Sequence, residues 1–191
     1  MMTEKALLKL ANGSDVRGIA VGGVADEPVN LTAEAANRIA SGFVEFLAQR
    51  TGLRKRDLRI AVGHDARMPA GTLKKSVFEA LTAAGCVTVD CGLASAPAMF
   101  MSTVFKATQM DGAIMITASH LPFNRNGLKF FTTEGGVEPK EIHEILESAC
   151  HHPEVQGNLA KVQKYDLMDR YCHFLRKKIR QALGEEDAPL K

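Results

Sequence analysis

A serine and a histidine stand side by side where a buried strand is expected to end. The apolar run 111–116 predicts that strand, and Ser119 and His120 follow it in a loop of turn-forming residues that leads to Lys129. Open α/β sheets usually keep their chemistry at the carboxyl ends of strands. Ser119 is therefore a candidate for three roles: a nucleophile, a carrier of a phosphoryl group, or a plain turn residue.

A serine that carries a phosphoryl group needs cations and hydrogen-bond donors around it, because its phosphoester bears nearly two negative charges. Three residues could supply them: His120, Lys129 and Arg17. The segment 124–127 (Asn-Arg-Asn-Gly) allows the tight or left-handed backbone that a phosphate cradle needs. Taken alone, these residue types still favour the plain turn, since Ser-His pairs are common.

A serine hydrolase is the weaker interpretation of the same pair. The pattern G-x-S-x-G is absent, and adjacent residues such as Ser119 and His120 point in different directions, whereas a triad histidine comes from elsewhere in the chain. His64, His143 and His173 are each expected to be surface or cap histidines.

A second polar turn, residues 63–67, follows a predicted strand at 58–63. Its Asp65 and Arg67 could pair with each other, cap the next helix or hold the loop of Ser119. Structural support is the predicted role, as is usual for an aspartate at a strand-to-helix junction.

Strands and helices alternate along the first 150 residues. Strands are predicted at 16–21, 58–63, 86–91, 111–117 and 128–132, and helices at 32–51, 70–84, 96–108 and 139–150. Thr32 is the predicted N-cap of its helix and Gly52 its stop. The alternation predicts a layered α/β/α domain, with helices on both faces of a mixed, mainly parallel sheet. The strand at 128–132 is expected to be antiparallel, because about ten residues are too few for a parallel crossover.

The pattern changes after residue 152. Residues 153–164 are polar and predict a linker, and 166–183 predict an amphipathic helix with apolar residues at every fourth position. We therefore place one domain at 1–152 and interpret 153–191 as a linker and helix that begin a second domain, through which the chain is expected to self-associate. The other interpretation is that the helix folds back on the first domain.

Composition limits the classes of function. The 191 residues include 24 basic and 22 acidic ones, a net charge of +2, which makes no electrostatic case for nucleic acid or membrane partners. The basic run 176–180 is interpreted as a solvated helix face. No run approaches the roughly 20 apolar residues of a membrane-spanning helix, and the N-terminus lacks a signal pattern.

Four cysteines bear on the cellular compartment: Cys86, Cys91, Cys150 and Cys172. They show no C-x-x-C spacing, so reduced thiols are expected and zinc is not. The chain is predicted to be a soluble intracellular protein. The cytoplasm is the expected compartment, and an organelle entered by way of a removed transit peptide stays open.

Three segments, taken together and in order, resemble a known family. They are 15–18 (Asp-Val-Arg-Gly), 63–67 (Gly-His-Asp-Ala-Arg) and 117–129, which opens with Thr-Ala-Ser-His-Leu-Pro and closes with Asn-Gly-Leu-Lys. Over about residues 10–150 the chain resembles the first domain of the α-D-phosphohexomutases. That superfamily includes phosphomannomutases, phosphoglucomutases and phosphoglucosamine mutases.

The resemblance implies that Ser119 is the phosphoserine of a mutase acting on a hexose phosphate. Its phosphoryl group would pass to the sugar, give a hexose bisphosphate, and return from the other end after the sugar turns. A hexose bisphosphate would serve as activator, and a phosphoserine oxygen would help to hold Mg²⁺. Lys129, His120 and Arg17 match positions near the transferring phosphoryl group. This agrees with the dependence of phosphoryl transfer on positioning and cations.

The resemblance also gives supporting roles in the phosphate loop. The residues concerned are Thr117, Asn126, Gly127, Asp65 and Arg67. Two positions depart from the pattern: Leu121 replaces the usual asparagine beside the phosphoserine, which puts loop geometry or rate in question, and His64 replaces an arginine in the second turn.

Length is the larger departure. The family has four domains, and its aspartate-rich metal loop (D-G-D-x-D-R), sugar-selecting loop and C-terminal phosphate loop have no counterpart in these 191 residues. The chain is therefore expected to be the phosphoserine domain of a mutase, inactive by itself, with its sugar undefined. The alternative is a non-catalytic binding or regulatory protein that kept the fold.

Overall fold

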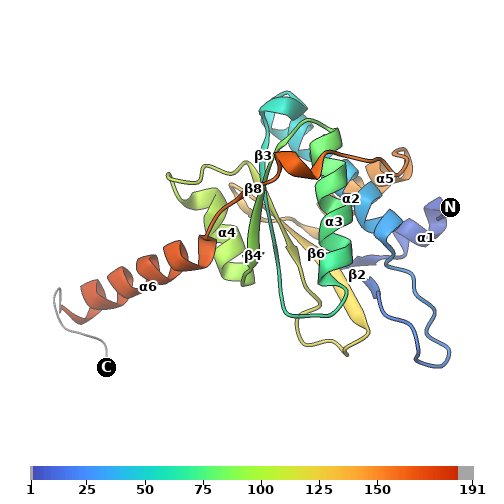
Figure 1. Cartoon of the computed structure of the whole chain (residues 1–191), viewed down its shortest axis with the longest axis horizontal. Coiled ribbons are helices and arrows are strands. Elements are labelled where there is room, and N and C mark those ends of the chain that lie inside the picture. The colour runs from blue at the N-terminus through green and yellow to red at the C-terminus, as the bar shows by residue number, and fades with distance from the viewer. Residues whose placement is uncertain (1, 185–191) are drawn as a thin grey trace.

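One mixed sheet organises residues 2–184, the part of the chain that the computed structural model describes. Its strand order is β1-β2-β6-β5-β3-β4-β8, and β7 pairs with β6 (Figure 1). The strands are β1 (Ala11–Asn12), β2 (Asp15–Ile19), β3 (Arg59–His64), β4 (Val87–Leu93), β5 (Gly112–Ile116), β6 (Arg125–Thr132), β7 (Gly135–Gly136) and β8 (Gln163–Lys164).

The middle of the sheet is parallel. Strand β3 pairs in parallel with β4 and β5, and β4 pairs in parallel with β8. Strand β6 is antiparallel to both of its long neighbours, β5 and β2. This confirms the mixed, mainly parallel sheet, and it confirms the antiparallel direction expected for residues 128–132.

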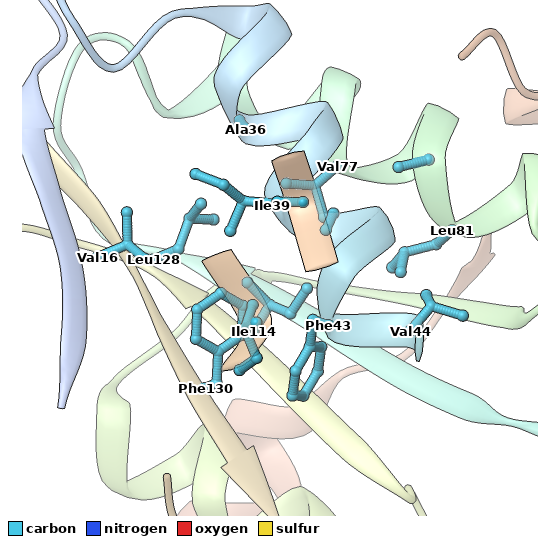
Figure 2. Packing of buried hydrophobic residues seen from close by; sticks show 14 of the residues in the cluster. Val16, Ala36, Ile39, Phe43, Val44, Val77, Leu81, Ile114, Leu128 and Phe130 are labelled. Atoms are coloured by element: carbon cyan, nitrogen blue, oxygen red, sulfur yellow. The ribbon is translucent and has the colours of Figure 1, made fainter. Parts of the chain in front are cut away.

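Helices cover both faces of the sheet, as predicted. The first face lies under α1 (Glu4–Leu8), α2 (Ala33–Thr51), α3 (Ala70–Ala83) and α5 (Pro139–Cys150), and the second under α4 (Ala96–Val104) and the start of α6 (Leu167–Leu183). In the core of the first face Phe43 of α2 packs on Phe130 of β6, with ring centroids 4.7 Å apart (Figure 2). An apolar core therefore packs against each face of the sheet.

The caps of α2 match the prediction. The Thr32 side chain accepts a hydrogen bond from the Ala35 amide (3.1 Å), and Gly52 ends the helix in the left-handed conformation, at φ +70°. Helix α4 is shorter than predicted: it ends at Val104 rather than near residue 108, because Phe105 adopts an extended backbone, with ψ 123°. Phe105 instead packs into the second core.

Strand β6 begins three residues earlier than predicted, at Arg125. Residues 125–127 pair with Ile19, Gly18 and Arg17 of β2, a partner strand that sequence periodicity does not reveal. The strand predicted at 16–21 is correspondingly displaced to Asp15–Ile19.

The linker predicted at 153–164 is wrong as a description of that segment. Its Val155 exchanges two hydrogen bonds with the Asn37 side chain of α2, both 2.9 Å long. A short 3-10 turn, η2 (Leu159–Lys161), then leads into β8, which extends the parallel sheet beside β4. Polar composition suggested a free linker, but the backbone groups of this segment are used by the first domain.

Helix α6 satisfies part of each interpretation of the C-terminal segment. Leu167 is fully buried, and Phe174 packs edge-on against Phe105, with ring centroids 5.3 Å apart. Leu175, Ile179 and Leu183 are 38%, 45% and 60% exposed, and the helix extends away from the sheet in Figure 1. The first turns fold back on the domain, and the later apolar stripe is open to solvent. Self-association through it stays a prediction.

The helices were also compared with the requirements of a membrane-spanning segment. Between residues 2 and 184, none of them combines the length and the apolar composition that a bilayer crossing needs.

Candidate functional site

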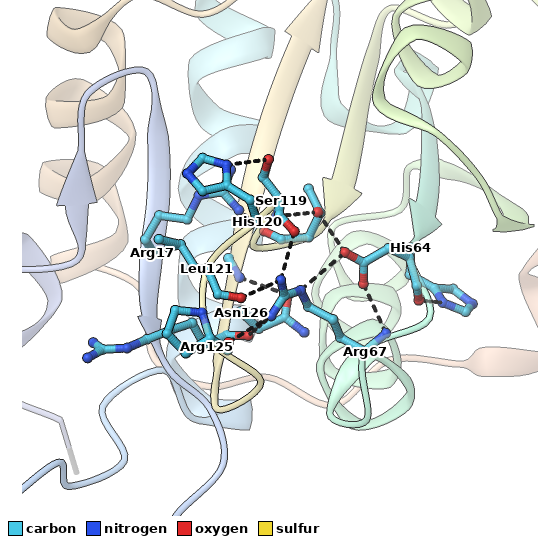
Figure 3. Close-up of polar contacts among 12 residues, drawn as sticks. Arg17, His64, Arg67, Ser119, His120, Leu121, Arg125 and Asn126 are labelled. Atoms are coloured by element: carbon cyan, nitrogen blue, oxygen red, sulfur yellow. Dashed lines mark hydrogen bonds and ion pairs between the residues drawn. The ribbon is translucent and has the colours of Figure 1, made fainter. Parts of the chain in front are cut away.

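Ser119 lies in the serine loop, residues 117–124, which joins β5 to β6. Its backbone is left-handed (φ +55°), a conformation uncommon outside glycine. Its amide donates to Thr117 Oγ1 (2.9 Å), and its Oγ lies 3.3 Å from Nδ1 of His120 (Figure 3). Both side chains are exposed. The turn therefore presents the hydroxyl to solvent, so a turn residue and a reactive serine are compatible roles here.

The guanidinium of Arg67 holds the serine loop by its backbone. Nη2 donates to the carbonyl oxygens of Ser119 and Leu121, both at 2.7 Å, and Nη1 donates to those of Pro122 (2.8 Å) and Arg125 (3.2 Å). A planar guanidinium suits this task because its donors diverge in a fixed geometry. Of the three roles considered for Arg67, its donors serve two: Nη1 and Nη2 hold the loop, and Nε pairs with Asp65.

Asp65 completes the support from the same turn. Its Oδ2 accepts a hydrogen bond from Thr117 Oγ1 (2.7 Å) and lies 3.5 Å from Arg67 Nε, and its Oδ1 accepts from the Arg67 amide (3.1 Å). Thr117 thus links Asp65 to the amide of Ser119. Asp65 does not cap α3, whose N-cap is Pro69 without a side-chain hydrogen bond. Structural support of the serine loop stays the prediction for Asp65, and these contacts are compatible with it.

Arg17 and Lys129 meet at an acidic side chain that sequence reasoning missed. Asp15 faces Lys129 in the pairing of β2 with β6, and its carboxylate lies 2.6 Å from Arg17 Nη2 and 2.7 Å from Lys129 Nζ. Arg17 Nη1 also donates to the carbonyl oxygen of Thr117. Arg17 therefore reaches the serine loop, whereas the ion pair of Lys129 is with Asp15.

Gly127 makes room for Arg17. A Cβ at Gly127 would lie 2.7 Å from Arg17 Cδ and 2.2 Å from the carbonyl oxygen of Val16, distances that no real side chain could occupy. The neighbouring Asn126 is fully buried, and its Oδ1 accepts a hydrogen bond from the Gly127 amide (2.8 Å). Both residues contact the backbone under the loop, and their supporting role stays a prediction.

Comparison with known proteins decides the family. The family model described as phosphoglucomutase/phosphomannomutase, alpha/beta/alpha domain I, matches residues 9–155. The chain belongs to this family. The resemblance to the N-terminal domain of the phosphohexomutases is thereby confirmed, and we refer to residues 9–155 as domain I.

Relatives of domain I include a probable phosphoglucosamine mutase from Methanopyrus kandleri, 34% identical over 128 residues, and a phosphoglucomutase/phosphomannomutase from Thermococcus kodakarensis, 31% identical over 163. The alignments cover 64% and 83% of this chain but only 26% and 34% of those proteins. The chain thus spans about a third or less of their length.

Solved structures share the fold. A phosphoglucomutase/phosphomannomutase family protein from Burkholderia thailandensis superposes with a TM-score of 0.67 at 21% identity, covering 89% of this chain and 35% of that one. The corresponding values for a putative phosphomannomutase from Thermus thermophilus are 0.66, 23%, 86% and 34%.

A second acidic residue of domain I also escaped sequence reasoning. Glu27, in the segment between β2 and α2, accepts hydrogen bonds from Asn124 Nδ2 (2.5 Å) and Arg125 Nη2 (2.6 Å). It thus binds the last residue of the serine loop and the first residue of β6. Asp15 could have been found, because residues two apart share one face of a strand, but no local pattern marks Glu27.

The two departures from the family pattern, Leu121 and His64, make backbone-directed contacts around the loop. Leu121 is half-buried and supplies its carbonyl oxygen to Arg67, a contact that is independent of its side chain. The ring of His64 lies 2.8 Å from the Asp65 carbonyl oxygen and points away from Ser119 in Figure 3. The exposed positions of His143 and His173 match the surface role predicted for them.

Metal-binding groups are scarce around the site. Among the described residues, no group of three or more His, Cys, Asp or Glu side chains is arranged to hold a metal ion. The acidic residues nearest in the network, Asp65 and Asp15, are already paired with arginine or lysine. The side chains around Ser119 therefore do not form a Mg²⁺ cage by themselves.

Proposed function

We propose that domain I carries the phosphoserine of a hexose-phosphate mutase at Ser119. One observation supports this most strongly: a solvent-exposed serine hydroxyl is held in a left-handed turn by a loop whose carbonyl oxygens are taken up by Arg67. Phosphoryl transfer depends on positioning and charge more than on covalent activation, and this loop supplies positioning.

The proposed reaction has two balanced halves. In the first, the Oγ–P bond of phosphorylated Ser119 breaks, a hydroxyl oxygen of the hexose phosphate forms the new P–O bond, and a base takes up the hydroxyl proton, which balances the proton that Ser119 gains. Ser119 Oγ regains a proton, for which His120 Nδ1 at 3.3 Å is the nearest titratable group in the loop. The second half is the reverse, with the other phosphate of the hexose bisphosphate.

The cations have separate proposed tasks. Arg17 donates to the carbonyl oxygen of Thr117, two residues before Ser119. From there its positive charge would stabilise the negative charge of a phosphoryl group on Ser119. Lys129 adds a second positive charge on the adjacent strand. If Mg²⁺ takes part, this chain would offer it a phosphoserine oxygen, and its other ligands would come from outside the described residues.

Intact-mass analysis tests the proposal. After incubation with glucose 1,6-bisphosphate as phosphoryl donor, the 191-residue chain is expected to gain one phosphoryl group that peptide mapping places on Ser119. Ser119→Ala should abolish the gain, and Ser148→Ala, a change at a half-buried serine of α5, should retain it. A folded chain that gains no phosphoryl group would instead favour the non-catalytic binding protein.

Turnover is expected only with the rest of a mutase present. With glucose 1-phosphate as substrate, the 191-residue chain should show no sustained conversion. Continuous conversion by this chain alone would contradict the proposed dependence on other domains.

A further inference from the structure

Asp15 is the only acidic partner recorded for either Arg17 or Lys129 among the described residues. Its two carboxylate oxygens are divided between them, Oδ2 at 2.6 Å from Arg17 Nη2 and Oδ1 at 2.7 Å from Lys129 Nζ. The three side chains are only 15%, 11% and 28% exposed. The carboxylate thus forms a bridge between two cations on adjacent strands, in a poorly solvated position.

The strand register explains how this bridge forms. Asp15 and Lys129 are direct cross-strand partners, and Arg17 lies two residues along β2, opposite Gly127. Since residues two apart project from the same face of a strand, all three side chains share one face of the sheet. Gly127 lacks a side chain, so Arg17 can lie across it toward Thr117.

The bridge has an electrostatic consequence for the serine loop. One negative charge between two positive charges leaves the triad with a net charge of +1, and it holds both cations in fixed positions. A phosphoryl group on or near Ser119 would attract the same two cations. Any anion at this edge of the sheet therefore competes with Asp15.

We propose that Asp15 is a positioning residue of the phosphoryl site, which clamps Arg17 and Lys129 and competes with the phosphoryl group for them. This inference rests on the proposed function of Ser119. In the protein without a phosphoryl group, Asp15 keeps both Arg17 and Lys129 in ion pairs. When the phosphoryl group is present, the cations divide between it and Asp15, so the carboxylate limits how tightly the site holds phosphate.

Phosphate titration of the 191-residue chain tests this role. Inorganic phosphate is the probe, and the amide NMR signals of Ser119 and His120 and the Nε–H signal of Arg17 report its binding. Asp15→Asn keeps the shape of the side chain and removes its charge. It should tighten phosphate binding on the order of fivefold at low ionic strength, with a smaller gain at high salt.

Two further variants separate positioning from a structural defect. Asp15→Glu restores the charge and should return the affinity toward that of the wild type. Asp90→Asn is the control. It removes a comparably buried carboxylate of β4, which lies 3.1 Å from Lys74 Nζ, and it should leave phosphate affinity unchanged. A defect in folding alone would weaken phosphate binding and would not strengthen it.

The outcomes distinguish the two proposals. Wild-type binding at Ser119 together with unchanged or weaker binding by folded Asp15→Asn would overturn the role of Asp15 and leave the proposed function standing. Absence of phosphate-induced shifts at Ser119 and Arg17 in both proteins would count against the phosphoryl site itself, and the role of Asp15 would fall with it.

Discussion

The serine loop and helix α6 are held in place in opposite ways. The loop has no regular secondary structure, yet Arg67 binds four of its carbonyl oxygens or those next to it, from 52 to 58 positions away in sequence. Helix α6 is fully regular, yet only its first turns are packed, through residues such as Leu167 and Phe174. Regularity and constraint are therefore separate properties in this chain, and the irregular segment is the more constrained one.

Gly127→Ala, under the serine loop, should lower the free energy of unfolding more than any other substitution considered for the loop. The new Cβ would meet the backbone carbonyl oxygen of Val16 at 2.2 Å, and backbone of a central strand cannot move aside cheaply. We expect a loss of about 3 kcal/mol or more in the free energy of unfolding, measured by urea denaturation.

Gly71→Ala is the matched control for this change. Gly71 lies in α3, and a Cβ there meets no atom within 4 Å. Alanine should stabilise the helix by about 0.5–1 kcal/mol. Equal effects of the two substitutions would mean that β2 and β6 can move apart enough to admit a methyl group at residue 127.

Arg67→Met should come next in size. It removes the guanidinium that satisfies the loop carbonyls, and a hydrogen bond to a charged group contributes about 1.5–3 kcal/mol net where it is buried. Water can replace part of this at the exposed carbonyl oxygens of the loop. We expect a net loss of about 2 kcal/mol, together with faster hydrogen exchange at the amides of Leu121 and Arg125, which close turns in the loop.

Arg50→Met serves as its control. Arg50 pairs with Glu134 and Glu141 in a more exposed setting, so its loss should cost no more than about 1 kcal/mol. Unchanged exchange rates in Arg67→Met would show that the loop holds its shape without the clamp.

Leu175→Asp should have a small effect on stability and a visible one on association. Leu175 is 38% exposed in the open stripe of α6, so the free energy of unfolding should change by less than about 0.5 kcal/mol. Sedimentation analysis should show weaker self-association than in the wild type. Leu167→Ala, at a fully buried position of the same helix, should cost about 2–3 kcal/mol. A wild-type chain that stays monomeric at high concentration would refute the self-association.

Thiol labelling gives the finest test, because it reports on the docking of α6. Cys91 shares the second core with Leu167, and Cys86 lies in the first core. Burial raises the pKa of each thiol to about 12. At pH 8 each should therefore carry roughly a thousandfold less reactive thiolate than an ordinary cysteine.

The exposed Cys172 of α6 should accordingly react first with iodoacetamide. The thiolate fractions of the two buried cysteines go on rising toward about pH 12, after that of an ordinary cysteine has levelled off. The ratio of labelling rates between Cys172 and the buried cysteines should therefore fall above about pH 9. Mass spectrometry of the labelled peptides measures all three rates. Faster labelling of Cys91 than of Cys86 would mean that α6 undocks readily.

Local signals in the sequence predicted much of the fold. Helix α2 was recognisable from its apolar spacing, its Thr32 cap and its Gly52 stop, all of which act within a few residues. The segment 153–164 was not, because its pairing with β4 and with Asn37 depends on neighbours far away in the chain.

In the candidate site, too, some residues could be predicted from local signals, whereas the contacts of others depend on the fold. Ser119, Arg17 and Lys129 stand out by residue type and motif, and Asp65 and Arg67 by their place after a strand. The contact of Asp15 with Lys129 depends on which strands are neighbours and in what register, and the contacts of Glu27 join a segment between elements to a distant loop. Neither pairing leaves a periodic trace in the sequence.

The amino-acid sequence by itself determined the alternation of strands and helices, the family, and the serine at the end of β5, because these follow from short-range periodicity, caps and a compact motif. Only the tertiary structure decided that Arg67 holds the serine loop, that Asp15 joins the two cations, and that α6 is packed for only part of its length. These features depend on strand order, register and the filling of two cores. Such long-range contacts form only when the whole sheet has assembled.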